Sequence, residues 1–252
     1  MIDQKTITGN LYAFYKAIVG RENYIFEDSS GLEAVFLPDK AWPAYILGNV
    51  SPSNPELEKI ILKMKLGDLP QFWIRQMDKT DDFDQLAIKS GIRPINKWLG
   101  MSLNIDVPFD IDSPSGDLIF ERIDSPDKMD SWVQRVNSEL MTSRKITTEV
   151  FVELLGRREF DFFQLKLGNK VVSTLLMFYQ KDVAGIYLVS TEKEFRGRGY
   201  GKFITSKAID YSIKKAYSNF VLHSTGLGEK IYSRLGFKHV CEYGIYWLVG
   251  KL

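Results

Sequence analysis

The chain has 252 residues, of which 44% are apolar and 26% charged, the composition of an ordinary globular protein with one large or two small domains. The formal net charge of +1 gives no bulk attraction for nucleic acid or an anionic membrane. Cys241 is the only cysteine, which excludes an internal disulfide and suits a reducing compartment. The first residues lack a signal-peptide core, and no run approaches the ~20 apolar residues of a membrane helix. We therefore expect a cytoplasmic protein with no nucleic-acid or membrane partner.

The first part of the chain, residues 1–106, has no low-complexity segment. It contains an aromatic-rich strand candidate at 41–50 and a helix candidate at 54–65. Residues 107–116 mix Pro, Gly, Ser and Asp, and they are the best linker candidate. We therefore expect two domains, at 1–106 and 117–252.

After the linker, the pattern predicts a strand at 118–123 and helices at 125–140 and 147–158. Residues 160–191 are typical of three successive strands. Gly168-Asn169 and Lys181-Asp182 mark the hairpin turns between them.

The end of the chain continues with helical spacing of apolar residues at 199–216. A strand at 219–225, a short helix at 226–236 and one or two final strands follow. This order predicts a mixed α/β (α+β) fold in which an antiparallel meander leads into a crossover connection.

The turn Arg196-Gly197-Arg198-Gly199-Tyr200-Gly201 joins a predicted strand to a predicted helix. A helix N-terminus carries unpaired N–H groups and partial positive charge, which favour an anion. Glycine lets the backbone approach a phosphate without an intervening Cβ atom, and successive amides then form an anion cradle. Arg196, Arg198 and Lys202 add positive charge. The turn is therefore a candidate phosphate site, and the alternative is a glycine-rich turn without a ligand.

The spacing of the glycines excludes two common phosphate motifs. A dinucleotide-binding Gly-x-Gly-x-x-Gly would need glycine at position 202, which is Lys202. The Walker motif fails because Lys202 is followed by Phe203 and not by Ser or Thr.

The segment Arg-x-x-Gly-x-Gly between a strand and a helix resembles the coenzyme A pyrophosphate loop of the GNAT acetyltransferase superfamily. Downstream, Ile231–Phe237 (IYSRLGF) is similar to the Tyr-x-x-Leu-Gly-Phe segment of that superfamily, with Gly228 four residues before the tyrosine. The resemblance covers residues 117–252. It implies a mostly antiparallel sheet flanked by helices, acetyl-coenzyme A as cosubstrate, and no metal.

The resemblance also implies which residues hold the coenzyme. In the family, the strand before the loop splays from its neighbour, and pantetheine lies in the gap. The expected coenzyme-binding residues here are Val189, Ser190, Thr191, Arg196, Gly197, Arg198, Gly199, Tyr200, Gly201, Lys202 and Thr225. Thr225 stands where the family often has asparagine, which puts that contact in question.

The implied reaction is the attack of a primary amine on an acyl thioester, which needs a base, a polarised carbonyl and a proton for the leaving thiolate. Tyr232 matches the family's general acid, and the alternative is that it only packs. Glu192 is a candidate base, although a solvated turn carboxylate is the interpretation we favour. Weaker base candidates are Glu149, Glu153 and Glu159. His223 lies within a predicted strand, where a structural role is expected.

The first part of the chain weakly resembles the second. FWIR (72–75) is similar to FVLH (220–223), and 86–103 is similar to 232–248, with Gly91 matching Gly236. AYILGNV (44–50) matches GIYLVST (185–191). This predicts a degenerate second copy, although chance alternation of aromatic residues is an alternative.

In that copy the glycine loop is replaced by SPSNPELEK (51–59), where prolines lack N–H donors, so we expect no coenzyme site there. The copy is instead expected to shape the acceptor pocket. We expect Trp42, Trp73 and Trp98 to pack in the core.

The leading functional hypothesis is an acetyl-coenzyme A-dependent N-acetyltransferase, an acyltransferase acting on a small-molecule or peptide amine. One alternative is transfer of a longer acyl or aminoacyl group. The other is a non-catalytic acyl-coenzyme A sensor or binding protein. The acceptor and the oligomeric state are not readable from the sequence.

Overall fold

The computed structural model describes residues 2–20, 25–27, 31–37, 41–49, 56–77, 83–111, 113–141 and 144–249. The helices are α1 (Gln4–Val19), α2 (Glu56–Leu66), α3 (Phe83–Lys89), α4 (Pro126–Leu140), α5 (Thr148–Val152), the short 3₁₀ helix η1 (Lys193–Phe195), α6 (Tyr200–Ile213) and α7 (Gly226–Ser233). The strands are β1 (Ile25–Glu27), β2 (Glu33–Phe36), β3 (Ala44–Leu47), β4 (Phe72–Gln76), β5 (Ile92–Asn104), β6 (Leu118–Arg122), β7 (Phe160–Leu167), β8 (Lys170–Gln180), β9 (Val183–Thr191), β10 (Asn219–Ser224) and β11 (Lys238–Leu248).

All the strands belong to one sheet with the order β1-β2-β3-β4-β11-β5-β10-β9-β8-β7-β6. The pairs β3–β4 and β9–β10 are parallel, and the other neighbouring pairs are antiparallel. The final strand of the chain, β11, lies between β4 and β5, so the sheet passes without a break between the N-terminal half, α1 to β5, and the C-terminal half, β6 to β11. The predicted mixed, mostly antiparallel fold is thus confirmed.

The strand ladder is symmetric about the β5–β11 pair. Trp98 pairs with Tyr243 at the centre of this ladder. The register shifts once in each strand: in β11 between His239 and Cys241, and in β5 opposite Ile245 and Tyr246. Strands β1 to β4 then continue on one side in the order that β7 to β10 follow on the other. The last strand of each half therefore pairs with the other half.

The structure places some residues of the two halves at equivalent positions, as the internal sequence comparison expected, but it places others one residue apart. Gly91 and Gly236 both have positive φ, 90° and 91°, at the turn before β5 and β11. In β4 and β10, however, Trp73 lies on the face of the sheet that Leu222 occupies, whereas Val221 packs on the opposite face. The pairing of FWIR with FVLH is therefore one residue out of register, because side chains alternate between faces.

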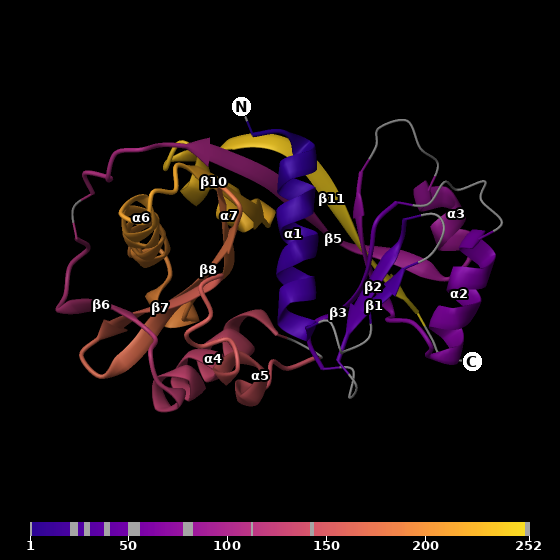
Figure 1. The fold of residues 1–252 in the computed structure, drawn as a ribbon, viewed down its shortest axis with the longest axis horizontal. Helices are drawn as coiled ribbons and strands as arrows, with labels where there is room; N and C mark the ends of the chain where they lie inside the picture. The colour runs from indigo at the N-terminus through magenta and orange to yellow at the C-terminus, as the bar shows by residue number, and fades with distance from the viewer. Residues whose placement is uncertain are drawn as a thin grey trace.

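Two layers of helices cover the sheet (Figure 1). Helices α1, α4 and α5 pack on one face, and α6 and α7 pack on the other face of the C-terminal half. Helix α1 begins where Asp3 Oδ1 accepts a hydrogen bond from Thr6 N at 2.8 Å, an N-cap. Its apolar stripe includes Ile7, Leu11 and Phe14, which are buried. Since α1 contacts β8, β9 and β10 as well as β2, a helix from the N-terminal half covers strands of the C-terminal half.

The elements predicted after residue 117 are confirmed, with one difference. The helix expected at 147–158 is shorter, because only Thr148–Val152 are helical and turns follow up to Gly156, whose φ is 79°. Of the one or two final strands expected, the structure has one long strand, β11. The replacement segment 51–59 lies mostly outside the described residues, except for the start of α2.

The predicted linker packs along α6. Phe109 N donates to Asp210 Oδ1 at 2.8 Å, and Tyr200 Oη donates to the carbonyl oxygen of Ser115 at 3.4 Å. The boundary between two domains stays a prediction. Within the described part of the chain, none of the helices has the length and apolar character that crossing a membrane requires.

Candidate functional site

The glycine loop, Arg196–Gly201, follows β9 and η1 and ends in the first turn of α6. Gly197 and Gly199 have φ values of 79° and 84°, and Gly199 is the N-cap residue of α6. A residue with a Cβ atom is strained in this left-handed region. Glycine at these two positions therefore lets the backbone turn into the helix without that strain.

The amides of this loop lack acceptors. Among the described residues, no hydrogen-bond acceptor is found for any backbone N–H from Gly197 to Lys202, whereas Phe203 N donates to the carbonyl of Gly199 at 2.9 Å. Unpaired amides at a helix N-terminus form an anion site. The guanidinium of Arg198 lies 5.1 Å from the ring centroid of Phe195, at the edge of the loop.

Strands β9 and β10 separate just before this loop. Their parallel pairing ends with Ile186 and Leu222, and Leu188 has a φ of 50° at a bulge opposite Leu175. In the described structure, no hydrogen bond joins 187–191 to 223–225. We call this opening the gap. It exposes the unpaired edge of β9 next to the glycine loop, as the family resemblance implies.

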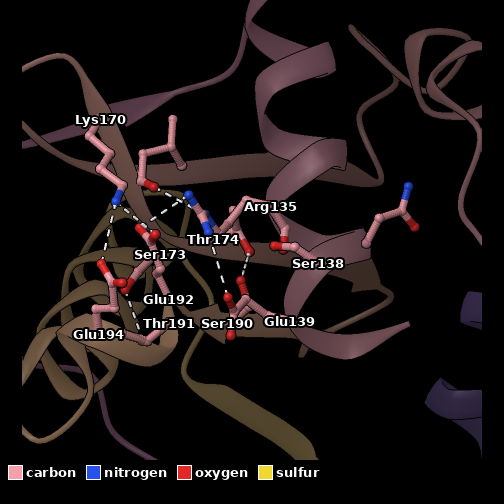
Figure 2. A network of polar contacts seen from close by, with 12 residues as sticks. Arg135, Ser138, Glu139, Lys170, Ser173, Thr174, Ser190, Thr191, Glu192 and Glu194 are labelled. Carbon is pink, nitrogen blue, oxygen red and sulfur yellow. Dashed lines mark hydrogen bonds and ion pairs between the residues drawn. The ribbon is translucent and has the colours of Figure 1, made fainter. Parts of the chain in front are cut away.

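The expected pantetheine-binding residues lie along this edge. Ser190 Oγ and Thr191 Oγ1 hydrogen bond to Thr174 Oγ1 and Ser173 Oγ of β8 at 2.7 and 2.9 Å. These hydrogen bonds connect the side chains of β9 to those of β8 (Figure 2). The backbone of Val189 to Thr191 is what β9 can offer a ligand in the gap.

Glu192 is held by two cations. Its carboxylate lies 3.1 Å from Arg135 Nη2 and 2.7 Å from Lys170 Nζ, and its side chain is 14% exposed (Figure 2). The expectation that Glu192 is a solvated turn carboxylate is therefore wrong, because the carboxylate is ion-paired and largely shielded from solvent. These contacts direct the carboxylate towards α4 and β8, and they bind it as an ion pair. The weaker candidates Glu149, Glu153 and Glu159 are exposed on α5 or after it.

Tyr232 and Thr225 belong to α7 and its start. The Tyr232 ring packs edge-on against Phe237, with centroids 6.0 Å apart, and burial raises the pKa of its hydroxyl above the usual value. A Cβ atom at Gly228 would lie 3.0 Å from Tyr232 Cε2, so glycine at this position leaves room for the tyrosine ring. Thr225 is the N-cap residue of α7, and its side chain makes no cap hydrogen bond, so its hydroxyl is available.

The N-terminal half has no such opening at the matching position between β3 and β4. Gly48 N donates to the Ile74 carbonyl at 3.2 Å, and Trp73 Nε1 donates to the Gly48 carbonyl at 2.9 Å. Gln76 N donates to Asn49 Oδ1 at 3.1 Å. These hydrogen bonds close the edge that the C-terminal half leaves open.

An open cavity of about 540 Å³ lies beside α1 and β4, away from the glycine loop. It is lined by Asp3, Gln4, Lys5, Thr8, Gly9, Tyr12 and Gln76. In the part of the chain that the structure covers, no group of His, Cys, Asp and Glu side chains that could hold a metal ion is found.

The whole fold resembles solved acetyltransferase structures. A GCN5-related N-acetyltransferase from Kribbella flavida matches with a TM-score of 0.73 and 12% identity, over 99% of this chain and 97% of the other. One from Sphaerobacter thermophilus gives 0.58 and 14%, over 88% and 82%. A functionally unknown conserved protein from Staphylococcus epidermidis ATCC 12228 gives 0.64 and 12%, over 92% and 97%. At these identities the likeness shows the fold, which is that of N-acetyltransferases.

Residues 127–237 match the acetyltransferase (GNAT) family, and no curated protein matches the chain. The matched segment includes the glycine loop, the gap and Tyr232. Members of this family use acetyl-coenzyme A.

Proposed function

We propose that the protein is an N-acetyltransferase that passes the acetyl group of acetyl-coenzyme A directly to an amine. The observation that carries the proposal is the set of unpaired amides from Gly197 to Lys202 beside the gap between β9 and β10. Amide–phosphate hydrogen bonds are charge-assisted and contribute roughly 1.5–3 kcal/mol each. The loop would hold the pyrophosphate, and the free edge of β9 would bind pantetheine.

The chemistry is assigned to groups around the gap. The amine nitrogen bonds to the thioester carbon, the C–S bond breaks, and the thiolate leaves with the bonding electron pair. Tyr232, kept protonated by burial, donates a proton to that thiolate, the amine nitrogen gives one proton to solvent water, and the tyrosinate then takes a proton back from solvent. The backbone of Leu188 and Val189, at the bulge, is the candidate for polarising the carbonyl.

We do not assign Glu192 as the base. Its two ion pairs would have to break before it could accept a proton from an amine or a water molecule. We propose that it instead fixes the end of β9 against α4 and β8, and so shapes the approach to the glycine loop.

We also propose that the N-terminal half is a second copy of the fold that has no coenzyme site. The symmetric ladder around β5 and β11 supports duplication. The hydrogen bonds that close β3 against β4 around Gly48 support the absence of a coenzyme gap. Its helix α1, which reaches β9 and β10, would contribute to the acceptor side.

Two measurements test the function. Calorimetry with acetyl-coenzyme A is expected to show one binding site per chain. Thiol release should then depend on an added amine. Binding without turnover over a broad amine panel would favour the acyl-coenzyme A sensor instead. Tighter binding of longer acyl-coenzyme A thioesters would favour transfer of a longer group, and no binding at all would contradict the proposal.

A further inference from the structure

The first residues beyond the last β9–β10 pair are Tyr187 and His223. Both side chains lie on the face of the sheet that α1 covers, since Tyr187 stacks on Phe14 of α1 with ring centroids 3.7 Å apart and an angle of 6°. The imidazole of His223 is nearly parallel to the Tyr187 ring, at 6.1 Å and 22°. These two rings therefore flank the place where the gap opens towards α1.

The imidazole of His223 is surrounded by aromatic rings and makes no hydrogen bond. Its centroid lies 4.9 Å from that of Tyr243 and 6.5 Å from that of Trp98. Both ring nitrogens are shielded from solvent, and neither has a partner among the described residues. A structural histidine normally pairs at least one nitrogen, so the purely structural role expected from the sequence leaves this arrangement unexplained.

Asn10 of α1 adds a second unpartnered group at the same place. It is 1% exposed, and its Oδ1 accepts a hydrogen bond from Tyr187 Oη at 2.7 Å, while its Nδ2 has no partner in the described structure. A Cβ atom at Gly185 would lie 2.1 Å from Asn10 Oδ1, so only glycine admits the amide here. The fold thus seats a polar amide tightly against β9 and leaves its donor group free.

Unpaired buried polar groups destabilise a folded protein, so each needs a partner, which is either a water molecule or a ligand. Here the free atoms come from two elements, α1 and β10, on either side of Tyr187 at the opening of the gap. The groups placed against them are Tyr187, Tyr243, Trp98 and Gly185, and none carries a charge. Burial lowers the pKa of His223 to about 3, so its imidazole is neutral at pH 7, with one donor and one acceptor nitrogen.

We propose that Asn10 and His223 bind the acceptor, and that this acceptor is a weakly basic amine on an aromatic or apolar body, bound uncharged. This inference rests on the proposed acetyl transfer. The Asn10 amide would donate to the acceptor, His223 would offer one donor and one acceptor, and the rings would cover its apolar part. A polycationic amine would find no counter-charge among these groups.

The sequence favours a direct test, because His223 and His239 are the only histidines. Imidazole ¹⁵N and ¹³C resonances of the full chain are recorded while acetyl-coenzyme A is added, with saturation followed separately by calorimetry. The expected result is a shift of the His223 signals and none of His239, whose side chain is 44% exposed. Because the bound amine must attack the thioester, an acceptor site at His223 requires the acetyl group of the coenzyme to lie nearby. Saturation without a His223 shift therefore overturns the inference and leaves the proposed function intact. No binding by calorimetry contradicts both.

The acceptor class is tested in the same spectra. Aniline and spermidine are each added, up to millimolar concentration, to the protein saturated with coenzyme A. Aniline is expected to move the His223 signals, and Asn10→Leu is expected to weaken that response at least fivefold without changing the affinity for coenzyme A. A stronger response to spermidine, which would mean that the rings bind an ammonium group, overturns the assignment. So does a spectrum that neither amine changes, or an unaltered response in Asn10→Leu.

Discussion

Arg196 of the glycine loop is tied to Glu139 of α4, with Nη2 and Oε2 2.8 Å apart. Its Nε also donates to the Thr191 carbonyl at 3.0 Å, so one side chain connects β9, the loop and α4. Glu139 in turn lies 3.5 Å from Arg135, which holds Glu192 (Figure 2). The loop is therefore braced by charged side chains before any ligand binds, which lowers the ordering cost of binding.

Replacing Glu139 with Gln should weaken coenzyme A binding by roughly 1.4- to fivefold, because an ion pair with one exposed partner contributes about 0.2–1 kcal/mol. Calorimetry measures the change. In an Arg196→Met background the same substitution should have no further effect on the affinity. Equal losses in both backgrounds would show that Glu139 does not act through Arg196.

The loop itself could be predicted from the sequence, whereas its braces could not. Strand, glycine pattern and helix are adjacent along the chain, so local rules place the amides of Gly197 to Lys202. Arg196 and Glu139 are 57 residues apart, and Asn10 and Tyr187 are 177 apart. Contacts of this range depend on which strands pair and which helix covers them, and no local pattern encodes that.

The sequence likewise did not predict that β5 and β11, the last strands of the two halves, each pair with the other half. The repeated pattern indicated similar elements in the two halves, but a strand's sequence does not state its neighbour. For the same reason, the surroundings of Glu192 were wrongly predicted. Its position after β9 was correctly predicted, but its cations come from α4 and β8.

Gly199→Ala should weaken coenzyme A binding by roughly tenfold. A residue with a Cβ atom at a φ of 84° costs about 1–2 kcal/mol, and relieving that strain would turn the amides away from the phosphates. Gly156→Ala is the matched control, since its φ is 79° and nothing lies within 4 Å of an added Cβ. Both variants should lose similar stability in urea, but only Gly199→Ala should lose affinity. An unchanged dissociation constant in Gly199→Ala would remove the loop from the site.

Tyr232→Phe should lower kcat on the order of 10²-fold while the affinity for coenzyme A stays within twofold, because only the proton donor is lost. Burial raises the pKa of this hydroxyl above its usual value, so it remains protonated and able to donate throughout neutral pH. The wild type should therefore show no loss of kcat below about pH 10 that depends on Tyr232. Steady-state rates of the two proteins across pH 6–10 check this, and equal rates would assign the tyrosine to packing alone.

Neutral His223, whose ring nitrogens are shielded from solvent, should make the protein less stable as the pH falls. Its folded-state pKa of about 3 lies below the unfolded value of 6.5, so the unfolded chain takes up the proton first when the pH drops below 6.5. The free energy of unfolding is then lost by up to about 1.4 kcal/mol per pH unit between 6.5 and 3, and is unaffected by this group above 6.5. Urea unfolding at pH 7 and pH 5 should differ by about 2 kcal/mol less in His223→Gln than in the wild type. His239→Gln, at a half-exposed position, is the control and should keep the wild-type difference. If His223→Gln also keeps that difference, the imidazole takes up its proton as readily in the folded protein as in the unfolded chain, and the shielding from solvent inferred for it is wrong.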